Sequence, residues 1–118
     1  MGSEPTTAVD PGWDLLKRVA AGDSSAFEPL VERHQERLLR VCERFLGDVE
    51  EARDAAQEAF LKLYRNAGSF HPRGQLFTLL YRIAVNHCLN RLRRRALVRF
   101  LRFADPGEDA GGEVGDAV

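Results

Sequence analysis

Apolar side chains recur with the period of a helix along most of the chain. Between Phe27 and Phe45 they lie three and four residues apart, which is the spacing of one face of an α-helix. The segments Trp13–Val19, Ala52–Tyr64 and Leu76–His87 repeat this spacing, and no segment alternates with the period of two that marks a strand. Four helices with short connections predict an all-α fold, a compact bundle of about four helices.

Residues that begin and end helices stand where this pattern is interrupted. The pair Asp10-Pro11 is typical of a helix N-terminus, and Asp48 offers a second N-terminal cap. Gly22 and Gly47 follow the first and second helices. Segment 68–74 reads Gly-Ser-Phe-His-Pro-Arg-Gly and is therefore predicted to be a loop before the fourth helix.

The polar ends of the chain frame one domain. We expect residues 1–12 to be disordered and residues 13–103 to form the helical domain. Residues 104–118 hold four glycines and five acids, so we expect a flexible acidic tail there. The fourth helix is expected to run to about Phe103, because the next residues combine proline and glycine.

The net charge of −1 conceals an uneven distribution. Residues 13–59 hold seven bases and eleven acids, whereas residues 60–103 hold ten bases and no acid. A long segment of one sign is typical of a polyanion partner, most often nucleic acid. The simpler interpretation is a basic face exposed to solvent.

Sequence motifs of enzymes are missing. The chain has no glycine-rich phosphate loop, no H-E-x-x-H and no nucleophile elbow, so we expect no catalytic residue, no metal site and no cofactor. His34 lies on an apolar stripe and is expected to be a core residue with its hydrogen bonds satisfied; Cys42 and Cys88 are expected to be small buried residues. Two cysteines outside any C-x-x-C favour a cytoplasmic protein, and no uncharged run exceeds eight residues, so membrane insertion is not expected.

Polar residues form a ribbon along the fourth helix. They lie four, four, four and three residues apart, on one side of the helix: Thr78, Arg82, Asn86, Asn90 and Arg93. Arginine and asparagine can hold phosphates and also hydrogen-bond to base edges. Phe70, Phe77 and Tyr81 precede or flank the ribbon, and aromatic rings beside basic residues suit unstacked bases. A core position for Phe77 and Tyr81 is the alternative.

The order and spacing of several segments resemble region 2 of the extracytoplasmic-function (ECF) sigma factors. These segments are Ala21-Gly22-Asp23 with Ala26-Phe27, the run Asp54-Ala-Ala-Gln-Glu-Ala-Phe-Leu-Lys-Leu-Tyr-Arg65, Ser69-Phe70, and Leu80-Tyr-Arg-Ile-Ala-Val-Asn86. The resemblance covers about residues 13–95. It implies bacterial core RNA polymerase and promoter DNA as partners, and an anti-sigma factor as an inhibitor.

The resemblance also implies two sets of site residues. The face that docks on the clamp helices of the largest polymerase subunit would hold Asp54, Gln57, Glu58, Leu61 and Arg65. The loop and the following helix would capture an unstacked base of the non-template strand in the promoter minus-ten element. The DNA-binding positions are then Phe70, Arg73, Leu79, Arg82, Ile83 and Asn86, followed on the same ribbon by Asn90 and Arg93. Phe70 is expected to wall or stack against the base and Asn86 to recognise its polar edge. A core position beneath the loop is the alternative for Phe70.

Two departures from the family pattern qualify these expectations. Leu79 stands where family members commonly have tryptophan, which puts unaided DNA melting in doubt. Family members also carry a second helical domain that reads the minus-thirty-five element, and we expect residues 104–118 to be the linker toward it. The alternative function is a helical interaction module, in which the basic amphipathic segment Arg93–Phe103 binds an acidic protein or a membrane surface.

Overall fold

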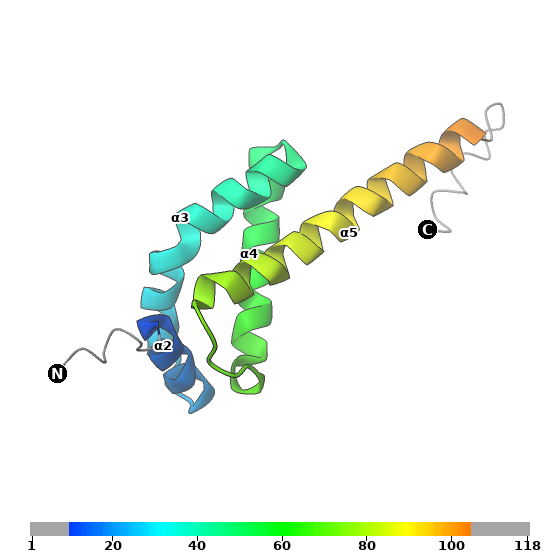
Figure 1. Cartoon of the computed structure of the whole chain (residues 1–118). Helices are drawn as coiled ribbons and strands as arrows, with labels where there is room; N and C mark the ends of the chain where they lie inside the picture. The colour runs from blue at the N-terminus through cyan, green and yellow to red at the C-terminus, as the bar shows by residue number, and fades with distance from the viewer. Residues whose placement is uncertain (1–9, 105–118) are drawn as a thin grey trace.

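Helices account for nearly all of residues 10–104, the part of the chain that the computed structural model describes (Figure 1). The predicted all-α fold is confirmed, and the described residues contain no strand. The expected disordered residues 1–9 and the expected acidic linker from 105 onward lie outside this part. In chain order the elements are α2 (Pro11–Ala20), the short 3₁₀ helix η1 (Ser24–Ala26), α3 (Phe27–Leu46), α4 (Val49–Arg65), the 3₁₀ helix η2 (Ala67–Ser69) and α5 (Leu76–Ala104).

The helix ends follow the predicted signals with one correction. Asp10 caps α2 by accepting a hydrogen bond from the Gly12 amide at 2.9 Å, with Pro11 in the first turn. Asp48 caps α4 in the same way, and Gly47 ends α3 in the left-handed conformation at φ 70°. The expected start of the domain at residue 13 is wrong, because α2 begins at Pro11 and Gly12 is buried. The folded part therefore includes both residues and their Asp10 cap.

The core lies where α3, α4 and α5 meet, and α2 covers one end of it. Side chains of every helix are almost fully enclosed there, among them Leu16, Leu30, Leu38, Leu63, Leu76 and Leu80. The α4 side of the core is built from small residues, since Ala52, Ala55, Ala56 and Ala59 are all buried. Small side chains let helix axes approach closely, so α4 can pack against both of its neighbours.

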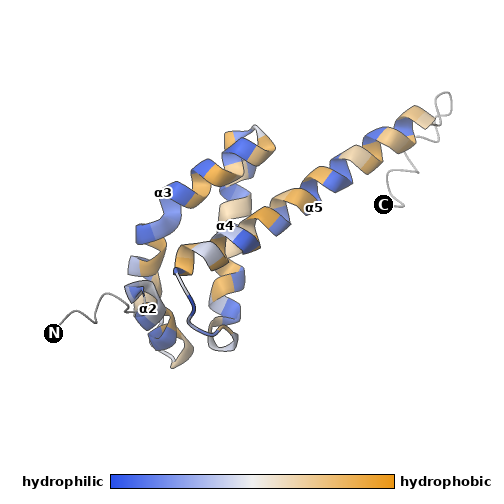
Figure 2. Cartoon of the chain, in the orientation of Figure 1, coloured by the Kyte–Doolittle hydropathy of each residue, from blue (hydrophilic) through white to orange (hydrophobic). Residues whose placement is uncertain are grey.

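Helix α5 belongs to the bundle only along its first half. Its buried residues end at Cys88, and the helix continues to Ala104 away from the other helices (Figure 1). Glu51 of α4 forms ion pairs with Arg91 and Arg95, which lie beyond the last buried residue of α5. Beyond them apolar and charged residues alternate along an open helix (Figure 2), and the exposed fraction of Phe103 reaches 84%. None of the described helices combines the length and apolar character needed to cross a bilayer.

Candidate nucleic-acid interface

A hollow opens between the loop before α5 and the first turns of that helix. Its volume is ≈ 240 Å³, and its walls come from α2, the loop and α5: Trp13, Ser69, Phe70, His71, Arg73, Thr78, Leu79 and Arg82. We call it the loop hollow. Four of the eight predicted DNA-binding residues line it together, namely Phe70, Arg73, Leu79 and Arg82. Two guanidinium groups, an aromatic ring and an aliphatic side chain therefore converge on one concave surface.

The N-terminal end of α2 holds the loop hollow in shape. Asp10 uses one carboxylate oxygen to cap α2 and the other to accept a hydrogen bond from the Leu76 amide at 3.0 Å, where α5 begins. The Trp13 indole donates to the Gly74 carbonyl at 2.9 Å. Gly74 has φ 61°, a conformation that glycine adopts at little cost. The turn into α5 is thus fixed by two contacts from residues more than sixty positions earlier.

The Asp10 carboxylate stays ionised easily in this setting. Partial burial pushes its pKa upward, but the hydrogen bonds from the Gly12 and Leu76 amides, together with the charges of His34 and Arg33, outweigh burial and hold the pKa below 3.8. A carboxylate that receives two backbone amides favours its charged form. Asp10 therefore serves as a shared cap for two helices at neutral pH.

The aromatic residues of this region divide between core and surface. Phe77 is buried, as the core alternative predicted, whereas Tyr81 is 43% exposed. Phe70 is half-buried, lining the loop hollow while it packs against the core. Its ring can therefore contribute to stability and still present a face to a ligand.

The remaining predicted DNA-binding residues follow α5 away from the loop hollow. Asn86, Asn90 and Arg93 are exposed, and the Arg93 guanidinium donates to the Asn90 side-chain oxygen at 2.8 Å. Ile83 differs from them, because it is half-buried, packs against the core and does not line the hollow. The structure thus gives one hollow and one exposed polar ribbon, with Ile83 turned toward the core.

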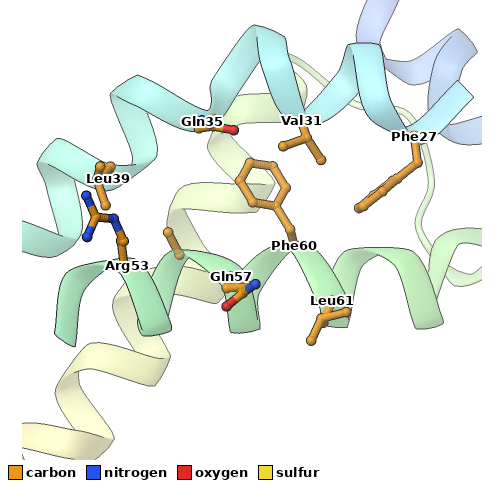
Figure 3. Close-up of a pocket in the computed structure, with 9 residues that line it drawn as sticks. Phe27, Val31, Gln35, Leu39, Arg53, Gln57, Phe60 and Leu61 are labelled. Carbon is orange, nitrogen blue, oxygen red and sulfur yellow. The ribbon is translucent and has the colours of Figure 1, made fainter. Parts of the chain in front are cut away.

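The predicted polymerase-binding residues share the exposed face of α4. Asp54, Gln57, Glu58, Leu61 and Arg65 are all exposed, at positions that recur every three or four residues. Gln57 and Leu61 also line a groove of ≈ 460 Å³ between α3 and α4 (Figure 3). Its floor and far wall contain Phe27, Val31, Gln35, Leu39 and Phe60, which the sequence had assigned to the core or left unassigned.

A second basic hollow was not predicted. Arginines of α3 and residues of the first turns of α5 line a space of ≈ 490 Å³: Arg37, Arg40, Val41, Arg44, Phe77, Thr78 and Tyr81. The Arg37 guanidinium lies 4.0 Å from the centroid of the Phe77 ring, a cation–π contact. The sequence signal is the spacing of the three arginines, which puts them on one face of α3. It was hidden because the segment that holds them is acidic overall.

The titratable groups of the core have shifted pKa values. His34 is buried as predicted, and its Nε2 atom has no hydrogen-bond partner among the described residues. Burial lowers the pKa of His34, and of His87 as well. Cys42 and Cys88 are both buried free cysteines, as predicted. Burial raises the pKa of Cys42 to about 12, and the neighbouring Cys88 adds to this effect.

Comparison with known proteins places this geometry in a family. The profile of the family described as Sigma-70 region 2 matches residues 30–98. The RNA polymerase sigma-H factor of Pseudomonas aeruginosa is 46% identical over 78 residues, which cover 66% of this chain and 40% of the relative. The ECF RNA polymerase sigma factor SigW of Bacillus subtilis is 41% identical over 80 residues, or 68% and 43% of the two chains. The match to the sigma-E factor of Escherichia coli K12 is 44% identical and covers 40% of that protein.

A solved structure is similar over most of the described part. It is the NMR structure of the complex formed by an engineered region 2 of sigmaE with GTAAAA, with a TM-score of 0.65 and 38% identity. The match covers 72% of this chain and 88% of that one. The chain spans about two fifths of the length of the curated relatives named above. It belongs to the sigma-70 region 2 family, with ECF sigma factors among its relatives.

Proposed function

We propose that this domain binds bacterial core RNA polymerase and the promoter minus-ten element, and that it captures an unstacked base of the non-template strand in the loop hollow. The observation that carries the proposal is the convergence of Phe70, Leu79 and two arginines on one concave surface. The relatives' names support it, as does the similar structure bound to GTAAAA. The step is one of binding, and we propose no covalent chemistry for it.

Different residues of the loop hollow would contact different parts of a nucleotide. The ring of Phe70 offers a face on which any base can stack, worth about 1–3 kcal/mol. Arg73 and Arg82 place positive charge beside it, where the phosphates of the same strand would pass. Leu79 supplies apolar contact without a second ring, so we expect stacking to depend mainly on Phe70.

The exposed ribbon of α5 would supply selectivity next to the hollow. Asn86 lies one helical turn beyond Arg82, and its amide can both donate and accept a hydrogen bond. Asn90 and Arg93 continue the same side of the helix along the strand. Ile83, which packs against the core, would support the ribbon from beneath rather than contact the base directly.

The groove between α3 and α4 is the surface we propose for polymerase. It combines apolar side chains, Phe27, Val31 and Leu39, with the exposed Arg53, Gln57 and Leu61 of α4, and the exposed acids of α4 lie on the same helix outside the groove. Asp54 and Glu58 lie one turn apart, so their charges act on one side of a docking helix. We propose the same face for an inhibitory anti-sigma factor, and a cytoplasmic location, where polymerase and promoter DNA meet.

Two substitutions at Phe70 test the base-capture proposal. Phe70→Leu keeps apolar bulk against the core but removes the ring, and Phe70→Ala removes both. If stacking matters, Phe70→Leu weakens binding to a minus-ten single strand about fivefold or more for every base, while its melting temperature stays near that of the parent. Normal promoter opening by a stably folded Phe70→Leu protein would contradict the proposal. Asn86→Ala should instead reduce discrimination among minus-ten variants.

Charge reversal on α4 tests polymerase docking separately. Replacing Asp54 and Glu58 with lysine should weaken binding to core polymerase and leave helix content unchanged, because both side chains are exposed. Substitution of Glu28 with lysine is the matched control, because Glu28 is an exposed acid of α3 and lies outside the exposed face of α4. Anionic vesicles test the alternative in which the open end of α5 binds a membrane surface: co-sedimentation with vesicles and no association with polymerase would favour it.

A further inference from the structure

The hollow between α3 and α5, which we call the arginine hollow, is built from both helices. Arg37, Arg40 and Arg44 come from α3, at positions that place them on one side of that helix. Thr78 and Tyr81 face them from the start of α5. The hollow therefore arises only where the two helices pack against each other.

The arginines of this hollow have no acidic partner within ion-pair distance among the described residues. No carboxylate lines it, and none of its arginines takes part in an ion pair found among residues 10–104. Arg37 is held against the ring of Phe77 at 4.0 Å, which fixes one guanidinium at the edge of the space. Guanidinium groups left without an acid are suited to phosphate, since they can donate two hydrogen bonds to one anion.

An exposed aromatic ring adjoins these charges. Tyr81 is 43% exposed, and its ring centroid lies 6.4 Å from that of the buried Phe77. A ring beside several cations is the combination that binds single-stranded nucleic acid, with the base on the ring and the phosphate on the cations. An acidic protein segment would use the cations and have no comparable use for the ring.

The two hollows are neighbours on the surface. Thr78 lines both the loop hollow and the arginine hollow. A strand whose unstacked base enters the loop hollow thus has its next nucleotide within reach of the arginines on the other side of Thr78. This adjacency favours one continuous ligand over two separate ones.

We propose that the arginine hollow is a second nucleotide subsite on single-stranded promoter DNA. Tyr81 stacks with the base of a nucleotide next to the captured one, and the arginines hold its phosphate. The inference rests on the proposed function, because it extends the same strand. It assigns DNA binding to α3, a helix whose residues the sequence and the resemblance had not placed at the DNA.

The test is an NMR titration of the purified domain with the strand GTAAAA and with strands shortened by one nucleotide from either end. The variants are Tyr81→Leu and Arg40→Gln, with Phe70→Leu for the loop hollow. Lys17→Gln, which removes an exposed cation of α2 that lines neither hollow nor the groove between α3 and α4, is the control for loss of charge alone. Tyr81 and Arg40 are exposed, so we expect each variant to keep the parent melting temperature.

We expect Tyr81→Leu to bind the full strand at least about fivefold more weakly. Arg40→Gln should reduce the slope of log affinity against log salt by about 0.7, the value for one phosphate on a single strand. Both effects should disappear when the strand is shortened at the end that reaches the arginine hollow. The Phe70→Leu effect should persist on that shortened strand.

The outcomes separate the two proposals. If the parent protein and Phe70→Leu both fail to distinguish the strand from an unrelated one, the proposed function itself fails. If Phe70→Leu weakens binding while Tyr81→Leu and Arg40→Gln match Lys17→Gln, only the second subsite is overturned. It is also overturned if those two variants bind DNA normally and lose core polymerase, since the hollow is then a protein contact.

Discussion

Replacing Asp10 with alanine removes the cap that α2 and α5 share. The carboxylate accepts one hydrogen bond from the Gly12 amide at 2.9 Å and another from the Leu76 amide at 3.0 Å. Loss of an N-terminal cap costs about 0.5–2 kcal/mol. Two caps on one side chain therefore predict a loss of roughly 2 kcal/mol, or a fall in melting temperature of about 8–16 °C for a domain of this size.

Asp10→Asn separates the two hydrogen bonds. The asparagine carbonyl oxygen can still accept from Gly12, but its amide nitrogen cannot accept from Leu76. We expect it to lose about half as much stability as Asp10→Ala. Asp48→Ala is the matched control, because Asp48 caps only α4; its expected cost is about 1 kcal/mol.

The pH dependence gives an independent check on Asp10. Burial raises its pKa, but the two amides outweigh burial, so the folded pKa lies below the ordinary value of 3.8. A depressed pKa stabilises the folded state above the ordinary value, and this stabilisation is lost as the pH falls through the folded pKa. Thermal unfolding followed by circular dichroism should show the difference between the parent and Asp10→Asn shrinking in acid. The shared-cap argument is refuted if Asp10→Ala has the same melting temperature as the parent at neutral pH. It is also refuted if Asp10→Ala lowers the melting temperature no more than Asp48→Ala does.

Three further predictions concern the core. The thiols of Cys42 and Cys88 are buried, and burial raises the pKa of Cys42 to about 12. Both thiols should therefore resist alkylation in the folded protein and react on unfolding, which mass spectrometry would show. Rapid labelling of the native state would contradict this. Because burial lowers the pKa of His34 below 6.5, folding stability measured by urea unfolding should fall as the pH drops below that value. His34→Gln should make this fall less steep, and His87, whose pKa burial also lowers, should account for the remainder. Gly12→Ala puts a methyl group 3.0 Å from the Leu76 side chain, which is fully enclosed. We therefore expect the free energy of unfolding to fall by about 1 kcal/mol or more in the same assay. An increase in the free energy of unfolding would show that the core there can shift.

Sequence patterns predicted the helices because their causes are local. The apolar spacing of α3, the cap at Asp48 and the glycine at 47 act within a few residues of each other, and each appears in the structure where expected. The start of the domain was set at residue 13 although the pair Asp10-Pro11 already indicated a helix from Pro11. The sequence did not reveal the hydrogen bond from Leu76 to Asp10, because a contact between residues so far apart leaves no periodic signal.

The candidate site was also predicted only in part, because some of its features depend on how the helices pack. Phe70, Arg73, Leu79 and Arg82 were named from the family resemblance, and the structure brings them into one hollow. Ile83 was placed at the DNA with them but packs against the core, because its position on α5 turns it toward the bundle. The arginine hollow was missed because the spacing of its arginines lies in a segment that is acidic overall, and because its other wall is supplied by α5 only where the two helices cross.

Helix α5 is continuous, so its length fixes the distance between the two ends of the helix. No glycine or proline interrupts its 29 residues, and a helix does not compress along its axis. From Arg82 at the loop hollow to Arg102 near the far end, the helix rises about 30 Å, close to the roughly 34 Å of one turn of duplex DNA. Deleting one residue from the open half would shorten that distance by about 1.5 Å and rotate everything beyond it by roughly 100°. The spacing between an opened base and any contact made by the distal arginines is therefore set by the number of residues in α5.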